Sequence, residues 1–104
     1  MAFELSLVIN ERLKGVVSKI RRGNSRLARQ IEDSACSVSA NLAEGSRREG
    51  QDRVHFYRIA AGSAEETRGH LRVALSWGWV AKVDIDAPLA LIDRQLGMLW
   101  RLTH

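Results

Sequence analysis

Apolar residues recur every three or four positions along almost the whole chain, which is the spacing of one face of an α-helix. Four such stripes can be followed. They are Leu5, Ile9, Leu13, Val16 and Ile20; Leu27, Ile31, Ala35, Val38 and Leu42; Tyr57, Ala61, Ala64, Leu71 and Leu75; and Leu89, Ile92, Leu96, Leu99 and Thr103. No segment alternates convincingly between apolar and polar residues, so the chain is predicted to be all-α.

Breaks between the stripes indicate where the helices begin and end. Gly23 interrupts the pattern, and either Asn24 or Ser25 can cap the helix that follows. The second stripe ends at Gly45 and the third at Gly78. Glycine commonly follows the last turn of a helix, so both positions are expected helix ends.

The last helix is expected to be capped by Asp84 or Asp86, with Pro88 in its first turn, where proline is tolerated. The four predicted helices cover about residues 3–22, 25–45, 51–77 and 86–102. Short connections between long helices favour antiparallel neighbours. We therefore predict an antiparallel up-down-up-down four-helix bundle that forms a single domain of residues 1–104.

The third predicted helix is apolar on more than one side. A second face, roughly opposite its stripe, contains four large apolar residues flanked by two glycines. These are Phe56, Ile59, Val73, Trp77, Gly62 and Gly69. A helix in an isolated bundle needs one buried stripe, so the second face favours contact with another copy of the chain. The alternative is that its ends only cover loops.

Composition bounds the class of protein. With 104 residues, 45% hydrophobic and 27% charged, the chain is typical of one globular domain. Its single cysteine, Cys36, excludes an intramolecular disulfide and a cysteine-based zinc site. The opening MAFELSLVINERLK lacks the basic leader of a signal peptide, and no apolar run approaches the roughly 20 residues of a membrane span. We expect a soluble cytoplasmic protein with no membrane partner.

The net charge of +4 is unevenly distributed. Residues 10–30 contain seven basic residues against Glu11 alone, whereas residues 59–104 contain five of each sign. Four arginines surround the break between the first two helices, namely Arg21, Arg22, Arg26 and Arg29. Such a cluster favours an anionic partner, with nucleic acid first. The alternative is the ordinary solvated face of a basic protein.

A polar stripe runs beside the second apolar stripe. Ser37, Asn41, Glu44 and Arg48 follow one another at helical spacing, about 110° around the helix from the apolar residues. This position is typical of a half-buried polar seam between helices, in which each polar group needs a partner. A nucleic-acid contact and a catalytic site are the alternatives.

Three arginines are predicted in or just after the loop GSRREG. Arg47, Arg48 and Arg53 have the planar guanidinium that binds phosphate oxygens in pairs. Equally, Glu49 and Asp52 can offset their charge in a solvated loop.

Candidate catalytic groups are sparse. The histidines, His55, His70 and His104, show no metal-ligand spacing, and no glycine-rich phosphate loop follows a strand. We therefore predict a protein that is not an enzyme and uses neither a metal nor a cofactor. The three tryptophans are expected to anchor the core or an interface, although an aromatic ring can also stack on a base.

Two blocks of sequence resemble one family. SVSANLAEGSRR and FYRIAAGSAEETRGHL are similar to the four-helix-bundle proteins encoded in intervening sequences of bacterial 23S rRNA genes. That family includes the accessory variability determinant of diversity-generating retroelements. Its members tend to read Ser-Ile-x-x-Asn-Ile-Ala-Glu-Gly, and the matching positions here are Ser37, Val38, Asn41, Leu42, Ala43, Glu44 and Gly45. In the second block, Ser63 and Glu66 are assigned to the polar seam together with Ser37, Asn41 and Glu44.

The sequence also departs from the family pattern. Many members begin the third helix with a Ser-x-x-Glu capping box, where Gly50 and Arg53 stand here, so a weaker cap is expected. Thr67 replaces a usual leucine.

The resemblance implies a homopentameric, ring-like assembly with a basic surface. For the retroelement relatives it implies nucleic-acid binding together with a reverse transcriptase. The leading hypothesis is thus a non-enzymatic oligomer that binds nucleic acid, RNA before DNA, through its arginines. The alternative is a scaffold that binds a protein partner, such as a reverse transcriptase, and no nucleic acid of its own.

Overall fold

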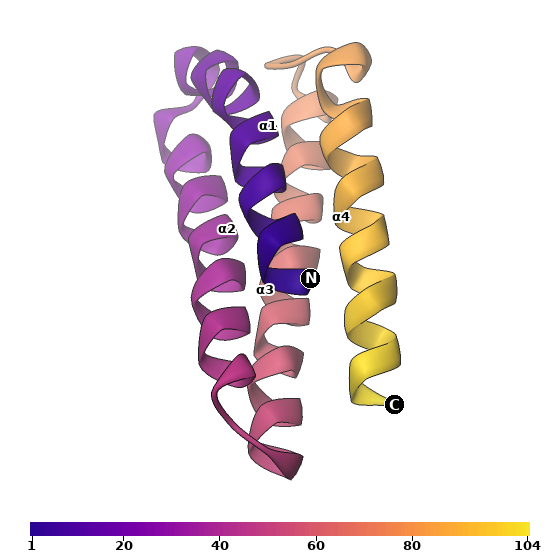
Figure 1. The fold of residues 1–104 in the computed structure, drawn as a ribbon. Helices are drawn as coiled ribbons and strands as arrows, with labels where there is room; N and C mark the ends of the chain where they lie inside the picture. Colours follow the sequence, from indigo (N-terminus) through magenta and orange to yellow (C-terminus); the bar gives the residue numbers. More distant parts are fainter.

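The computed structural model describes residues 1–104 as a bundle of four helices and no strands. The helices are α1 (Ala2–Gly23), α2 (Ser25–Ser46), α3 (Gly50–Ser76) and α4 (Lys82–Thr103). Consecutive helices pack side by side, and α4 also packs on α1 (Figure 1). None of the four combines the length and hydropathy of a membrane span.

The connections between the helices gather at two ends of the bundle. The α1–α2 turn and the α3–α4 link lie at one end, which we call the turn end (residues 19–29 and 77–82) (Figure 1). The α2–α3 loop lies at the other, which we call the loop end (residues 44–53) (Figure 1). Residues of the α1–α2 turn and residues of the α2–α3 loop therefore lie at opposite ends of the bundle.

The first two predicted stripes form the core as expected. All ten of their residues are buried, and Ile20, Ile31 and Leu42 are at most 1% exposed. The break between α1 and α2 is also as predicted, because the Asn24 side chain accepts a hydrogen bond from the Leu27 amide at 2.9 Å. This N-cap satisfies one of the amides that the first turn leaves unpaired.

The third and fourth predicted stripes are right in part. Ala64, Leu71, Ile92 and Leu99 are buried as expected, whereas at Ala61, Leu75, Leu89 and Leu96 the buried residue is the one before. The buried residues of α3 are Ala60, Ala64, Thr67, Leu71 and Ala74, and those of α4 are Ile85, Pro88, Ile92, Gln95 and Leu99. Leu75 is 37% exposed, and Leu89, Leu96 and Thr103 are only half-buried. The buried face of each helix contains one polar residue, together with small side chains in α3 and a cyclic one in α4. A prediction based on large apolar residues therefore selects positions beside the buried face.

Helix α4 begins four residues earlier than predicted. Its N-cap is Ala81, and the Asp84 carboxylate accepts a hydrogen bond from the Ala81 amide at 2.9 Å. Pro88 therefore lies in the second turn and not in the first. There it removes the hydrogen bond that an amide would donate to the carbonyl of Asp84.

A polar layer crosses the core, with one buried polar side chain from each helix. Its members are Ser6, Ser34, Thr67 and Gln95, each at most 5% exposed. The Ser34 and Thr67 hydroxyls are 2.7 Å apart, and Ser6 accepts from the Ser39 hydroxyl at 2.8 Å. Ser6, Thr67 and Gln95 also line a cavity of about 10 Å³.

Gln95 is the exception in this layer, because its amide nitrogen is buried without a hydrogen-bond partner. An unpaired buried donor costs about 1–3 kcal/mol, so Gln95→Leu should raise the free energy of unfolding by a similar amount. Urea denaturation measures the change. Thr67→Val is the control, since it removes a paired hydroxyl and should lower stability. A less stable Gln95→Leu protein would mean that the amide is satisfied in solution, for example by a water molecule in the adjoining cavity.

Candidate nucleic-acid interface

Four arginines of the predicted cluster meet at the turn end. Arg21 and Arg22 lie in the last turn of α1, and Arg26 and Arg29 lie near the start of α2, all with exposed side chains. Arg21 is occupied, because its guanidinium pairs with Glu32 at 2.8 Å. The other three make no ion pair or side-chain hydrogen bond within the chain, so their donors are free for a ligand.

Other charges at this end neutralise one another. Lys19 bridges α1 and α4 by pairing with Asp84 at 2.8 Å, and Lys82 pairs with Asp86 at 3.1 Å. The hydrogen bonds from Lys19 and from the Ala81 amide hold the pKa of Asp84 below its ordinary value. The excess positive charge of the turn end therefore resides in Arg22, Arg26 and Arg29.

The helix dipole adds to this excess. The N-terminus of α2 is its positive pole, and acidic residues usually occupy the first turn to offset it. α2 has no acidic residue in its first turn and places Arg26 there instead. A cation at this position lowers the stability of the helix and strengthens the attraction of its N-terminus for an anion.

The loop arginines are engaged within the chain. Arg47 and Arg48 both pair with Glu44, at 2.6 and 2.8 Å, and Arg48 also lies 5.1 Å from the centre of the Phe56 ring. Hydrogen bonds from Arg48 and then Arg47 hold the pKa of Glu44 below its ordinary value. Arg53 donates to the carbonyls of Gly45 and Ser46 and so closes the end of α2.

The two groups of predicted nucleic-acid-binding arginines are thus at opposite ends of α2. This helix has 22 residues, so its ends are separated by about 33 Å at 1.5 Å per residue. A nucleic acid would have to extend over this distance to contact both groups of one chain at once. The predicted site is accordingly two separate surfaces, of which the turn end has the free cations.

Two residues of the predicted polar seam, Ser37 and Ser63, join α2 to α3 directly. The hydroxyls of Ser37 and Ser63 are 2.8 Å apart, and the Asn41 amide donates to the Ser37 carbonyl at 2.8 Å. Glu44 lies further along the same helix, among the loop arginines. Glu66 does not join the seam: its side chain is exposed and lies 3.3 Å from His70.

The predicted second face of α3 is mainly exposed. Ile59 and Val73 are 39% and 45% exposed, and a methyl group added at Gly62 or Gly69 would meet no atom within 4 Å. Phe56 is half-buried beneath Arg48. This face therefore has no partner within the bundle.

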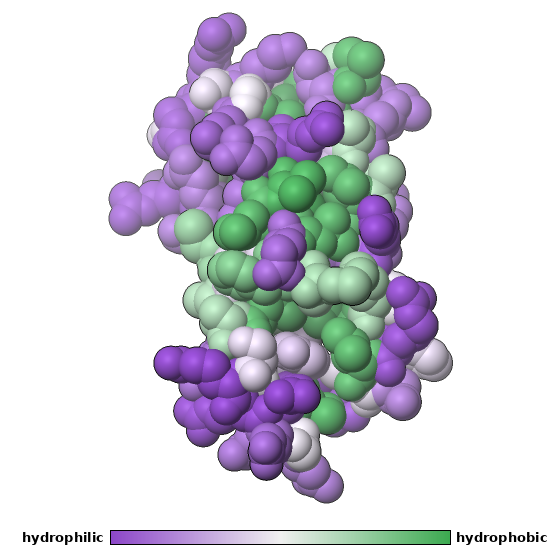
Figure 2. Space-filling view, viewed as in Figure 1, coloured by the Kyte–Doolittle hydropathy of each residue, from purple (hydrophilic) through white to green (hydrophobic).

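A further apolar surface was not predicted from the sequence. Figure 2 shows it across the middle of the face formed by α1 and α4, with hydrophilic residues gathered at both ends. Leu7 and Val8 of α1 are each 44% exposed, and Leu102 of α4 is 51% exposed. In the sequence these residues stand beside the apolar stripes. An apolar residue in that position can belong either to the core or to an exposed patch, and the spacing alone does not say which.

Of the three tryptophans expected to anchor the core or an interface, two lie outside the core of the bundle. Trp77 is 69% exposed and Trp100 is 62% exposed. Trp77 stacks on Trp79 at the turn end, with ring centres 5.7 Å apart and planes 11° from parallel. Trp100 stacks on His104 near the opposite end of α4.

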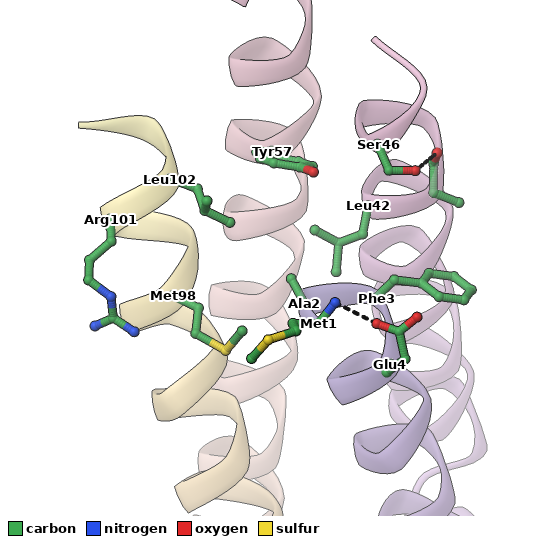
Figure 3. Close-up of a pocket in the computed structure, with 11 residues that line it drawn as sticks. Met1, Ala2, Phe3, Glu4, Leu42, Ser46, Tyr57, Met98, Arg101 and Leu102 are labelled. Carbon is green, nitrogen blue, oxygen red and sulfur yellow. Dashed lines mark hydrogen bonds and ion pairs between the residues drawn. The ribbon is translucent and has the colours of Figure 1, made fainter. Parts of the chain in front are cut away.

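A cavity of about 600 Å³ opens near the first turn of α1 (Figure 3). Its lining is mainly apolar and comes from all four helices, with Phe3, Leu42, Tyr57, Met98 and Leu102 among the residues. Arg101 is the single basic side chain in the lining. The cavity therefore has few groups that could bind a phosphate, and it lies apart from the free arginines of the turn end.

Comparison with known proteins agrees with this fold. A sequence model of the 23S rRNA-intervening sequence protein family matches residues 1–101. The crystal structure of a Bacteroides thetaiotaomicron protein of unknown function, from the S23 ribosomal protein family, is similar with a TM-score of 0.87 and 17% sequence identity. The similarity covers 99% of this chain and 98% of that one and, at this identity, shows the fold alone.

No curated protein matches the chain. The family match nevertheless spans almost the whole sequence, including both blocks on which the resemblance was based and all four helices of the bundle. The chain therefore belongs to the 23S rRNA-intervening sequence protein family.

Proposed function

We propose that this protein is a non-enzymatic, oligomeric nucleic-acid-binding protein that uses the turn end as its interface. The observation that carries the proposal is the group of three exposed arginines without acidic partners beside the positive pole of α2, namely Arg22, Arg26 and Arg29. The name of the family connects its members with 23S rRNA, so RNA is the first ligand to test. The loop arginines stand outside the proposed interface, because Glu44 and the end of α2 occupy them.

Binding through arginines and phosphates should depend steeply on salt. Each neutralised phosphate contributes about 0.7 to 0.9 to the slope of log K against log salt, so three contacts predict a slope of about −2 to −3 per chain. Fluorescence anisotropy with a labelled 12-nucleotide RNA, from 50 to 200 mM salt, measures this slope. Little preference for sequence is expected, because phosphate contacts carry no base information.

Two results would contradict the proposal. Affinity that does not change with salt would remove its electrostatic basis. A protein that binds neither RNA nor DNA at 50 mM salt would favour the alternative function, a scaffold for a protein partner such as a reverse transcriptase.

The assembly that we propose is a ring-like homo-oligomer, a pentamer in the first instance, of antiparallel up-down-up-down bundles. α1 and α3 are diagonal in the bundle and make no extensive contact, so their outer faces point in opposite directions. One chain thus has two different apolar surfaces, the second face of α3 and the face of α1 and α4 (Figure 2). Head-to-tail contact between unlike surfaces forms a ring when the rotation between neighbouring subunits closes, and an open filament when it does not.

Val73→Glu should convert the assembly to monomers, because it would bury an unpaired carboxylate between subunits. In the isolated chain Val73 is 45% exposed, so the bundle itself should remain folded. Light scattering after gel filtration gives the mass, and circular dichroism confirms the helices. Val83→Glu is the matched control, since Val83 is 81% exposed in the first turn of α4 and belongs to a different helix from Val73. A monomeric wild-type protein would contradict the assembly.

A further inference from the structure

The turn end contains a pair of stacked tryptophans, Trp77 and Trp79. Trp79 is half-buried and covers the backbone of Gly23, where any side-chain atom would collide with its indole ring. This contact explains the glycine between α1 and α2 and fixes the position of Trp79. Trp77 then stacks on Trp79 with nearly parallel planes.

One face of the Trp77 ring is therefore free. The side chain is 69% exposed, although its other face is covered by Trp79. A large aromatic ring in water gains free energy when its open face is covered, and parallel rings prefer an offset stack such as this pair already forms. The pair has the form of a stack to which a third planar ring can be added.

The surroundings indicate which planar ring it would be. Trp79 covers Gly23, and Arg22 is the neighbouring residue, so the stack adjoins the arginine group of the turn end. Single-stranded nucleic acids are bound by this combination, in which cations follow the phosphates while aromatic side chains stack on unpaired bases. A base within a duplex has both faces covered by its neighbours and cannot occupy the position.

We propose that Trp77 is a stacking platform for an unpaired base, so that the turn end prefers single-stranded over double-stranded nucleic acid. The inference rests on the proposed function and deepens it by naming the ligand class. It also assigns the free ring face of Trp77 to a base, whereas the sequence favoured a contact with another subunit for this residue. Ile59 and Val73 remain in the proposed subunit contact.

The test compares a 12-nucleotide single-stranded RNA with the 12-base-pair duplex of the same sequence, using the full chain at one fixed salt concentration. Loss of one stacked base corresponds to about 5- to 150-fold in affinity. Trp77→Leu should weaken single-strand binding by that factor and leave duplex binding unchanged. Trp100→Leu is the matched control, because Trp100 is similarly exposed but lies toward the other end of α4, and it should change neither affinity.

A second measurement, the fluorescence of Trp77, reports on its indole ring directly. In the Trp100→Leu protein, single-stranded RNA should quench tryptophan fluorescence, and adding Trp77→Leu should remove most of that quenching. The mass of Trp77→Leu should equal that of the wild type.

Each other outcome overturns the inference. If wild-type binding depends on salt as expected but Trp77→Leu binds both ligands normally, the stacking role is wrong and the proposed function stands. Equal losses for single strand and duplex also contradict stacking. A reduced mass of Trp77→Leu would place the ring in a subunit contact. Absence of any nucleic-acid binding by the wild type would overturn the proposed function and this inference together.

Discussion

The triple variant Arg22→Gln, Arg26→Gln, Arg29→Gln should lose most of its affinity for nucleic acid, on the order of a hundredfold at 50 mM salt. The slope of log K against log salt should become shallower by about 2 to 3, because three phosphate contacts are removed. Anisotropy titrations over the same salt range as for the wild type measure both quantities. Arg21 is left in place, because its guanidinium is already paired with Glu32.

A control of equal charge separates a local site from net charge. Arg72→Gln, Arg94→Gln and Arg101→Gln together remove three exposed arginines that also lack ion pairs but lie on α3 and α4. Both triple variants lower the formal net charge from +4 to +1. Comparable losses in the two proteins would mean that the whole basic surface binds and that the turn end is no special site.

The same substitutions should not weaken the fold. A cation in the first turn of α2 opposes the helix dipole, so Arg26→Gln is expected to leave stability unchanged or raise it by a few tenths of a kcal/mol. A large loss of stability in the triple variant would instead give these arginines a structural role.

Gly45→Ala should be among the most destabilising single substitutions in this chain that add one carbon atom. A Cβ atom at position 45 would lie 2.6 Å from Cε1 and 2.7 Å from Cδ1 of the Tyr57 ring. Glycine allows α3 to approach the end of α2 closely at this point. We expect a loss of about 1–3 kcal/mol from overpacking, which exceeds the gain of up to about 1 kcal/mol in helix propensity.

Gly15→Ala is the matched comparison in urea denaturation. Gly15 lies in α1, where an added Cβ meets no atom within 4 Å, so this variant should be more stable by about 0.5–1 kcal/mol. If both substitutions raise the free energy of unfolding, the contact between Gly45 and Tyr57 can relax without a loss of stability.

These contacts also give a physical account of the block SVSANLAEGSRR. Ser37 and Asn41 form a small hydrogen-bonded group where α2 meets α3, Glu44 holds the two arginines that follow, and Gly45 admits the ring of Tyr57. Each of these roles joins α2 to its own end or to α3. The block is best explained as a structural link at the end of α2.

The sequence by itself determined the four helices and the cores of α1 and α2. Their apolar residues are large and regularly spaced, and Asn24 caps α2 through a purely local hydrogen bond. Local propensity, spacing and capping depend on residues a few positions apart, so they can be read along one chain.

Only the tertiary structure decided which faces of α3 and α4 are buried and which arginines are free. Thr67 is buried because Ser34 of another helix meets it, and a polar residue at such a position contradicts the pattern until its partner is known. Arg21 is occupied by Glu32, 11 positions along the chain, whereas Arg22 beside it has no partner. Trp79 packs on Gly23, although the two are 56 positions apart in the sequence, whereas Trp77 remains exposed. Packing and ion pairing join residues distant in sequence, so composition and spacing can propose such a site, but the fold alone decides which of its side chains are available to a ligand.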